Sequence, residues 1–277
     1  MSWIDTGVNL LDPRFTLADV LLRAAQAKVN NILVISSTLG ESEQALALCK
    51  KHNHPPVCES IHVNDLNKQL ISKVKLACTA GIHPHYADQA KRESWTKLNA
   101  LSADNHITAI GECGLDFNRN FSTRTNQLYA FEQQLNIAAN NNMGVYLHER
   151  DAFDEQMILL EQYAPSLKFM VTHCFTGNKE QLNGYLSLGC YVGITGWLCD
   201  EKRGQQLREA VLNLPLSRLL LETDAPYLFP KTLKPRKSKN EPCFLPHIAE
   251  SLSEIINVDI STIEKHAFDN AFTLFFS

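Results

Sequence analysis

The sequence lacks the features that mark membrane and exported proteins. Its longest apolar runs, such as 32–35 and 219–221, are far too short to span a bilayer. The N-terminus has no basic segment followed by an apolar stretch, which is the pattern of a signal peptide. We therefore expect a cytoplasmic protein that does not contact a membrane, and we expect it to be a monomer.

Strong positive charge and paired cysteines are also missing. The net charge is −4, so the chain lacks the overall basic field of a protein that coats DNA. This argues against tight non-specific binding to duplexes, but an enzyme that binds a few phosphates locally remains compatible with it. The eight cysteines include no CxxC pair, and we predict that they are reduced and mostly buried.

Short apolar segments typical of strands alternate with longer amphipathic segments along the whole chain. This alternation implies parallel strands joined by right-handed helical crossovers. Eight such units predict a single α/β domain over residues 1–277, a (β/α)₈ TIM-like barrel, with an open doubly wound sheet as the competing fold. The predicted strands are 2–9, 31–37, 76–82, 107–111, 144–148, 168–173, 190–195 and 218–223, and predicted helices include 17–27, 41–51, 123–141, 202–212, 244–256 and 261–275.

Two stretches interrupt the alternation. Residues at about 53–74 separate a helix from the next strand by more than a loop needs, so we predict an insertion there. Residues 231–239 (KTLKPRKSK) form a basic loop after the eighth strand. We expect its charges to be mostly solvated, although the loop should border the mouth of a barrel.

Side chains able to bind a metal ion or move a proton follow nearly every predicted strand. In a barrel the carboxyl ends of all strands open on one face, which holds the active site. Each histidine taken alone is as often structural as functional, but a buried carboxylate must be paired or bound to a metal. Six coincidences at strand ends favour a site. The candidates are Asp5, His83, His85, Glu112, Asp116, His148, Arg150, His173 and Asp224.

These residues suit a divalent cation and a phosphate. Imidazoles and carboxylates around one pocket can hold an ion and leave positions for water or substrate. Arg150 lies two residues after His148 and should point to the same face, where it would bind phosphate or form a surface salt bridge. Asp116 equally fits a helix cap. A nucleophile at Cys113 or Cys174 is a less favoured alternative.

Five motifs follow the predicted strands: 81–85 (GIHPH), 110–116 (IGECGLD), 148–151 (HERD), 172–177 (THCFTG) and 221–226 (LETDAP). Together they resemble the TatD-type metal-dependent deoxyribonucleases of the amidohydrolase superfamily, over the whole chain except the insertion. Two more stretches, 116–122 (DFNRNFS) and 193–200 (GITGWLCD), resemble TatD proper more than its paralogues.

The resemblance implies a barrel that hydrolyses the phosphodiester bonds of DNA, with RNA as a further candidate substrate. It implies a 3′-to-5′ exonuclease that prefers single strands and uses a divalent cation, expected to be magnesium, with manganese or zinc as alternatives. By the family pattern Glu112, His148 and His173 are metal ligands. Asp224 is a further metal ligand and, with Glu112, a catalytic residue. His83, His85 and Arg150 bind near the substrate phosphate.

One departure from the family pattern concerns the first strand. Many relatives have Asp-x-His-x-His there, whereas this chain has Asp5, Gly7 and Asn9. We therefore expect one well-formed metal site, with Asp5 supporting a second, weaker ion. The alternatives are a D-aminoacyl-tRNA deacylase or another metal-dependent ester or amide hydrolase on the same barrel, and a non-catalytic binding protein.

Overall fold

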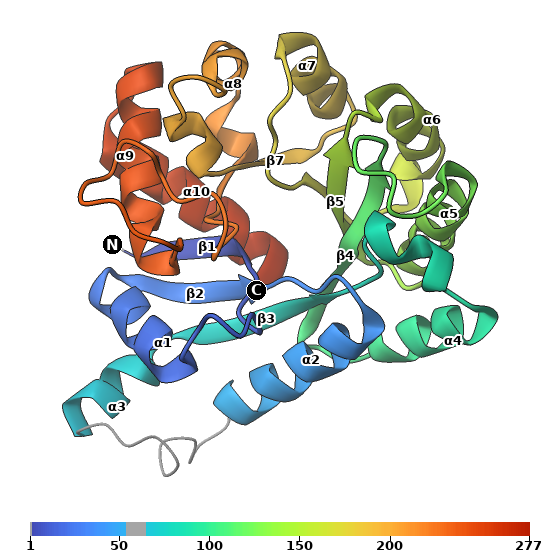
Figure 1. Ribbon diagram of the computed structural model, residues 1–277, viewed down its shortest axis with the longest axis horizontal. Coiled ribbons are helices and arrows are strands. Elements are labelled where there is room, and N and C mark those ends of the chain that lie inside the picture. The colour runs from blue at the N-terminus through green and yellow to red at the C-terminus, as the bar shows by residue number, and fades with distance from the viewer. Residues whose placement is uncertain (1, 54–64) are drawn as a thin grey trace.

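The structure is a computed structural model that describes residues 2–53 and 65–277. Eight parallel strands form one sheet in chain order from β1 to β8. A bridge between Val8 and Ala225 joins the first strand to the segment after the last, so the sheet curves into a nearly closed barrel (Figure 1). The predicted barrel is confirmed, and the open doubly wound sheet is excluded. The strands are β1 (Trp3–Val8), β2 (Val29–Val34), β3 (Lys75–Ala80), β4 (Ile107–Asp116), β5 (Gly144–Arg150), β6 (Met170–Thr172), β7 (Tyr191–Ile194) and β8 (Leu219–Leu221).

Helices cover the outside of the barrel (Figure 1). Helix α1 illustrates why: its apolar residues Val20, Leu21 and Ala24 recur at helical spacing and are buried against the sheet. The six predicted helices are all present, within three residues at each end. The helices are α1 (Leu17–Gln26), α2 (Leu39–Asn53), α3 (Asp65–Ile71), α4 (Arg92–Leu101), α5 (Arg124–Asn140), α6 (Phe153–Tyr163), α7 (Lys179–Ser187), α8 (Gln205–Val211), α9 (Leu245–Ile256) and α10 (Ile260–Phe275).

The inside of the barrel is a packed core. Side chains from most of the strands, among them Ile4, Leu33 and Leu220, form one apolar cluster there. Helix α10 contributes Phe275 to this cluster, with its ring centroid 6.4 Å from that of Tyr146. A filled interior leaves the end of the barrel as the place for a pocket, as in other α/β barrels.

Strand β4 is longer than predicted and carries the first site residue. It continues to Asp116, which pairs with Arg150 of β5, whereas the prediction ended it at residue 111. Its register shifts between Gly111 and Cys113, so a bulge falls on Glu112. At Gly114 the φ angle is +134°, and an added Cβ would lie 2.0 Å from the His148 carbonyl oxygen. Glycine therefore lets the two strands approach closely enough to continue pairing.

Strands β6 and β8 are shorter than predicted. Each has three residues. Strand β6 begins two residues later than predicted, and both strands end where the polar residues begin and the backbone bends. Cys174, which follows His173, has a φ angle of +45°, and Asp224 has a φ angle of +52°. Both values lie in the left-handed region, which ends an extended strand.

Three further expectations concern the insertion, the cysteines and membrane-spanning helices. Residues 54–64 of the predicted insertion at 53–74 lie outside the described residues, and residues 65–71 form α3, in which Ile71 is buried. The described cysteines are all free, and most are buried, as predicted. Across residues 2–53 and 65–277, no helix combines the length and the apolar character needed to cross a bilayer.

The substitution Gly81→Ala should destabilise the fold by about 1–3 kcal/mol. An added Cβ would lie 2.6 Å from the Gly111 carbonyl carbon, so β3 and β4 would have to separate. Gly40→Ala is the matched control, because its Cβ would meet no atom closer than 4.0 Å. Urea unfolding followed by circular dichroism measures both. Equal stability of the two variants would contradict this packing.

Candidate metal centre

A pocket of about 600 Å³ lies at the carboxyl ends of the strands. It brings together residues that are far apart in the sequence, as the barrel prediction requires. Asp5 is the one candidate ligand that does not line it. The predicted residues that do are His83, His85, Glu112, Asp116, His148, Arg150, His173 and Asp224.

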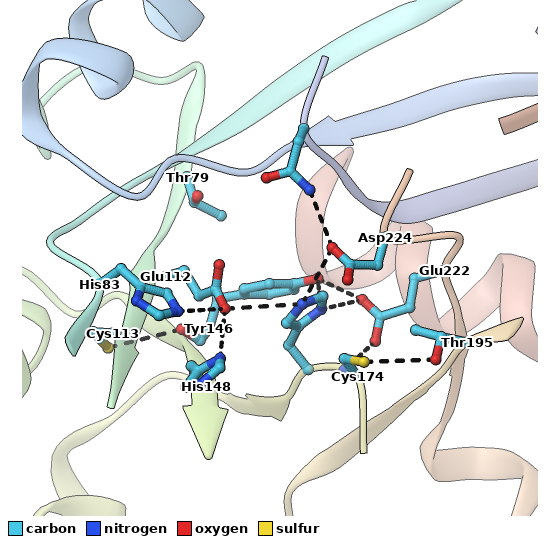
Figure 2. A network of polar contacts seen from close by, with 12 residues as sticks. Thr79, His83, Glu112, Cys113, Tyr146, His148, Cys174, Thr195, Glu222 and Asp224 are labelled. Atoms are coloured by element: carbon cyan, nitrogen blue, oxygen red, sulfur yellow. Dashed lines mark hydrogen bonds and ion pairs between the residues drawn. The ribbon is translucent and has the colours of Figure 1, made fainter. Parts of the chain in front are cut away.

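Glu112 is the centre of this pocket. Figure 2 shows its carboxylate beside the rings of His83 and His148. Its Oε1 atom lies 2.9 Å from His148 Nδ1, 3.4 Å from His83 Nε2 and 3.9 Å from His173 Nε2. Burial alone raises the pKa of Glu112, but the three imidazoles outweigh it and hold the pKa well below its usual value. The residue is thus a buried, ionised carboxylate in contact with nitrogen ligands.

The position of the proton on His83 follows from its neighbours. Its Nδ1 atom accepts a hydrogen bond of 3.1 Å from the backbone N–H of His85. Burial lowers the pKa of His83 to about 4, so the ring is neutral and carries its single proton on Nε2. His83 therefore faces Glu112 and the pocket as a hydrogen-bond donor, which suits a phosphate oxygen better than a metal ion.

Asp116 links two histidines at the side of the pocket. Its Oδ2 atom lies 2.7 Å from His85 Nε2 and 3.3 Å from His148 Nε2. Burial raises the pKa of Asp116, but these two rings outweigh it and lower the pKa. Burial also opposes the charge on His148, but Asp116 and Glu112 raise its pKa to about 9. Asp116 is thus part of the site, and its Oδ1 atom also accepts the backbone N–H groups of Asn118 and Arg119.

His173 is oriented from behind by two residues that the sequence prediction missed. Its Nδ1 atom lies 2.6 Å from Glu222 Oε2 and 2.7 Å from the Tyr146 hydroxyl. Glu222 also accepts the Cys174 N–H at 2.6 Å, and both Glu222 and Tyr146 are fully buried. Because Nδ1 faces this carboxylate, Nε2 faces Glu112 and Asp224. A carboxylate behind a ligating histidine is a common feature of metal sites.

The departure at Gly7 has a structural explanation. A Cβ on Gly7 would lie 2.5 Å from Glu222 Oε2 and 2.6 Å from the Tyr146 hydroxyl. A Cβ on Gly193 would lie 1.7 Å from Glu222 Oε1. The space that a histidine at position 7 would need is therefore occupied by the group that orients His173.

Asp224 lies on the other side of His173 from Glu112. Its Oδ1 atom accepts a hydrogen bond of 3.1 Å from Asn9 Nδ2 and lies 3.9 Å from His173 Nε2. Burial, reinforced by Glu112 and Glu222, raises the pKa of Asp224 to about 7. An aspartate with this pKa can accept or release a proton near neutral pH.

The donor atoms fit a divalent cation. His173 Nε2 lies 3.9 Å from both Glu112 Oε1 and Asp224 Oδ1, which is too long for hydrogen bonds. Bonds of about 2.0–2.2 Å to one ion place its ligands about 3–4 Å apart. The described residues form two neighbouring groups able to hold an ion, which are His83, Glu112 and His148, and His173, Cys174 and Asp224.

Asp5 belongs to neither group. Its carboxylate is buried, and Thr223 donates to both oxygens, through N–H at 2.9 Å and Oγ1 at 2.6 Å. Burial raises the pKa of Asp5 to about 8. The structure thus places Asp5 where it fixes the segment that carries Asp224, and its assignment as a ligand stays a prediction.

Arg150 lies at the rim, as its position after His148 indicates. Its guanidinium is 3.4 Å from Thr176 Oγ1 and 5.9 Å from the centroid of the Trp197 ring. The alternative ion pair with Asp151 is long, at 4.0 Å, and both side chains are largely exposed. The guanidinium remains available for phosphate. Arg203 covers the Trp197 ring at 4.2 Å and also lines the pocket.

The cysteine alternative loses support. Burial raises the pKa of both the Cys113 and the Cys174 thiols well above the usual value. A thiol nucleophile needs a lowered pKa.

Glu222 could have been found from the sequence. It follows an apolar strand directly, and the rule that a buried carboxylate must be paired or bound to a metal, which singled out Glu112 and Asp224, applies to it as well.

Comparisons with known proteins show the family of this chain. The model of the family described as "TatD related DNase" matches residues 4–276. A curated protein of Erwinia tasmaniensis is 42% identical over 275 residues, which cover 98% of each chain, and is named "3'-5' ssDNA/RNA exonuclease TatD". A protein of Escherichia fergusonii with the same name is also 42% identical over 98% of each chain.

A solved structure extends the match to three dimensions. The TatD homologue YJJV from Escherichia coli K12 superposes with a TM-score of 0.82 at 27% identity, over 99% of this chain and 97% of the other. The barrel is that of a metal-dependent hydrolase, and its pocket contains histidines and carboxylates able to hold a divalent metal ion. Within that class, the chain belongs to the TatD-related DNase family.

The substitution Glu222→Gln should weaken the binding of Mn²⁺ about 10- to 100-fold, because His173 loses the carboxylate that orients it. Isothermal titration calorimetry measures the affinity. Glu264→Gln is the control, because this buried carboxylate of α10 does not line the candidate metal centre and instead lines another pocket with Ser2, at the amino end of β1. An unchanged affinity in Glu222→Gln would contradict the role given to Glu222.

Metal binding should become tighter as pH rises. Without an ion, neighbouring carboxylates raise the pKa of His148 to about 9 and that of His173 to about 10, against the effect of burial. Both rings are then protonated at pH 7, and only neutral imidazole can bind a metal. The ion must displace these protons, so its apparent affinity falls as pH falls below these values. Calorimetry in buffers of different ionisation enthalpy should detect proton release; its absence would contradict this account.

Proposed function

We propose that this protein is a metal-dependent 3′-to-5′ exonuclease that degrades single-stranded DNA and RNA with magnesium as its working ion. The observation that carries the proposal is the position of Glu112: its Oε1 atom lies beside His83 and His148, which form one group of candidate ligands with it, and 3.9 Å from His173 of the other group. The curated relatives at 42% identity, named as 3'-5' ssDNA/RNA exonucleases, support the same reaction and polarity. Magnesium is inferred from the resemblance, since imidazole ligands also suit manganese and zinc.

Glu112, His148, His173 and Asp224 would hold the cation. A bound divalent cation polarises a phosphoryl oxygen and lowers the pKa of water. Asp224 accepts the proton of the attacking water, because Asn9 fixes its carboxylate and burial raises its pKa to about 7. Glu222 and Tyr146 keep His173 directed at the pocket.

The substrate phosphate is held from the rim. Neutral His83 offers its Nε2–H, and Arg150 offers a guanidinium whose planar shape matches phosphate oxygens. His85 is bound to Asp116 and lies next to His83, with ring centroids 4.2 Å apart. Donors arranged in this way before the substrate arrives stabilise the charge that develops on the phosphate.

The substitution Asp224→Asn should lower kcat about 10²- to 10⁴-fold, because the amide cannot accept the proton. Glu112→Ala should abolish metal-dependent activity. The assay follows single-stranded oligonucleotides labelled at the 5′ or the 3′ end, with Mg²⁺, Mn²⁺, Zn²⁺ or EDTA. Early release of the 3′ label gives the polarity, and Glu264→Gln serves as the control.

Two results would overturn the proposal. Full activity of Glu112→Ala with metal present would remove the ion from the assigned site. A wild-type protein that cleaves no oligonucleotide with any ion, but hydrolyses D-aminoacyl-tRNA, would move the function to ester hydrolysis on the same barrel.

A further inference from the structure

Phe121 is an exposed apolar side chain at the edge of the candidate metal centre. It lies between β4 and α5, lines the pocket, and is 63% exposed. Its ring contacts His85 edge to face, with centroids 4.7 Å apart, and the Arg119 guanidinium lies 6.0 Å from its centroid. Most of the ring surface is therefore available to another molecule.

The exposure does not come from a loose loop. Asp116 Oδ1 accepts the N–H groups of Asn118 and Arg119, and Asn120 Nδ2 donates to the Phe117 carbonyl at 2.6 Å. The next residue, Ser122, is 2% exposed and donates to the His85 carbonyl at 2.9 Å. Residues on both sides of Phe121 are fixed, so the fold itself projects the ring into solvent at the pocket.

Two exposed aromatic side chains outside this pocket have aromatic packing partners: Phe272 stacks on Phe268, with centroids 5.7 Å apart, and Tyr129 contacts Trp95. Tyr86 and Tyr227 line the pocket as well, but they are less exposed than Phe121, at 36% and 49%. Phe121 instead contacts the polar side chains of the site. Ring contacts connect it to the metal centre, because the His85 centroid is 4.7 Å from Phe121 and 6.0 Å from His148.

We propose that Phe121 is a positioning residue that stacks on the base of a nucleotide at the 3′ end of the substrate strand. The proposal rests on the nuclease function proposed above. An unpaired base exposes both faces of its ring, and stacking on an aromatic side chain tolerates any sequence. A base inside a duplex is already stacked and paired, so this contact would favour single strands. Arg119 and Arg150 line the same pocket and supply positive charge for the adjoining phosphates.

The kinetic test compares Phe121→Ala with Phe121→Trp and with Phe272→Ala, the matched control, on a single-stranded oligonucleotide with Mg²⁺. Phe121→Ala should lower kcat/KM on the order of tenfold, mainly through KM, because stacking holds the ground state and the transition state alike. Phe121→Trp should restore the value and Phe272→Ala should not change it. A loss confined to kcat, or no loss, overturns the proposal.

An altered substrate separates stacking from a merely structural role. The oligonucleotide is made with an abasic site at its last or its next-to-last 3′ position. Where the missing base is the one that stacks, wild type and Phe121→Ala should have the same kcat/KM. If Phe121→Ala is impaired equally on the normal strand and on both abasic strands, the ring acts through the protein alone and the proposal is wrong.

A binding experiment without cleavage tests the stacking role of Phe121 separately from the nuclease function. Asp224→Asn and Asp224→Asn/Phe121→Ala are titrated with an oligonucleotide that carries 2-aminopurine at each of the two positions. Stacking quenches the fluorescence of this base, so quenching should occur in the single variant and be lost in the double variant. If quenching occurs in Asp224→Asn but the wild-type protein cleaves no oligonucleotide, only the nuclease function is contradicted. Equal fluorescence and affinity in both variants would overturn the stacking role.

Discussion

The buried charge of Glu112 is the constraint on which the site depends. An ionised carboxylate in a protein interior is costly unless it is paired or bound to a metal. Here three imidazole rings surround it and hold its pKa well below the usual value. Glu112 belongs to one group of candidate ligands, with His148, and lies 3.9 Å from His173 of the other group. The pocket is therefore organised around a negative charge that a divalent cation can share.

The barrel supplies this arrangement through its backbone and its packed interior. A bulge in β4 sets Glu112 apart from the regular register with β5. Tyr146 extends from the apolar interior of the barrel, and its hydroxyl meets Glu222 and His173 at the base of the pocket. Gly7 and Gly193 have no side chain, and this leaves the space that Glu222 occupies. The apolar core and the polar site are thus parts of one packed unit.

The sequence predicted the barrel and the convergence of Glu112 and Asp224, because alternating elements and the geometry of strand ends depend on pattern alone. It did not predict the role of Glu222, because a pattern does not tell which way a side chain points or which histidine it contacts. The length of β4 was also missed. Its continuation depends on the close approach that Gly114 permits, which is a property of the paired strands and not of the segment itself.

The most direct test of the account is a crystal structure of the protein soaked with Mn²⁺, with anomalous scattering used to locate the ion. The account predicts an anomalous peak within bonding distance of Glu112 Oε1, next to His148 or His173. A peak remote from Glu112, or no peak with the pocket residues ordered, would contradict it.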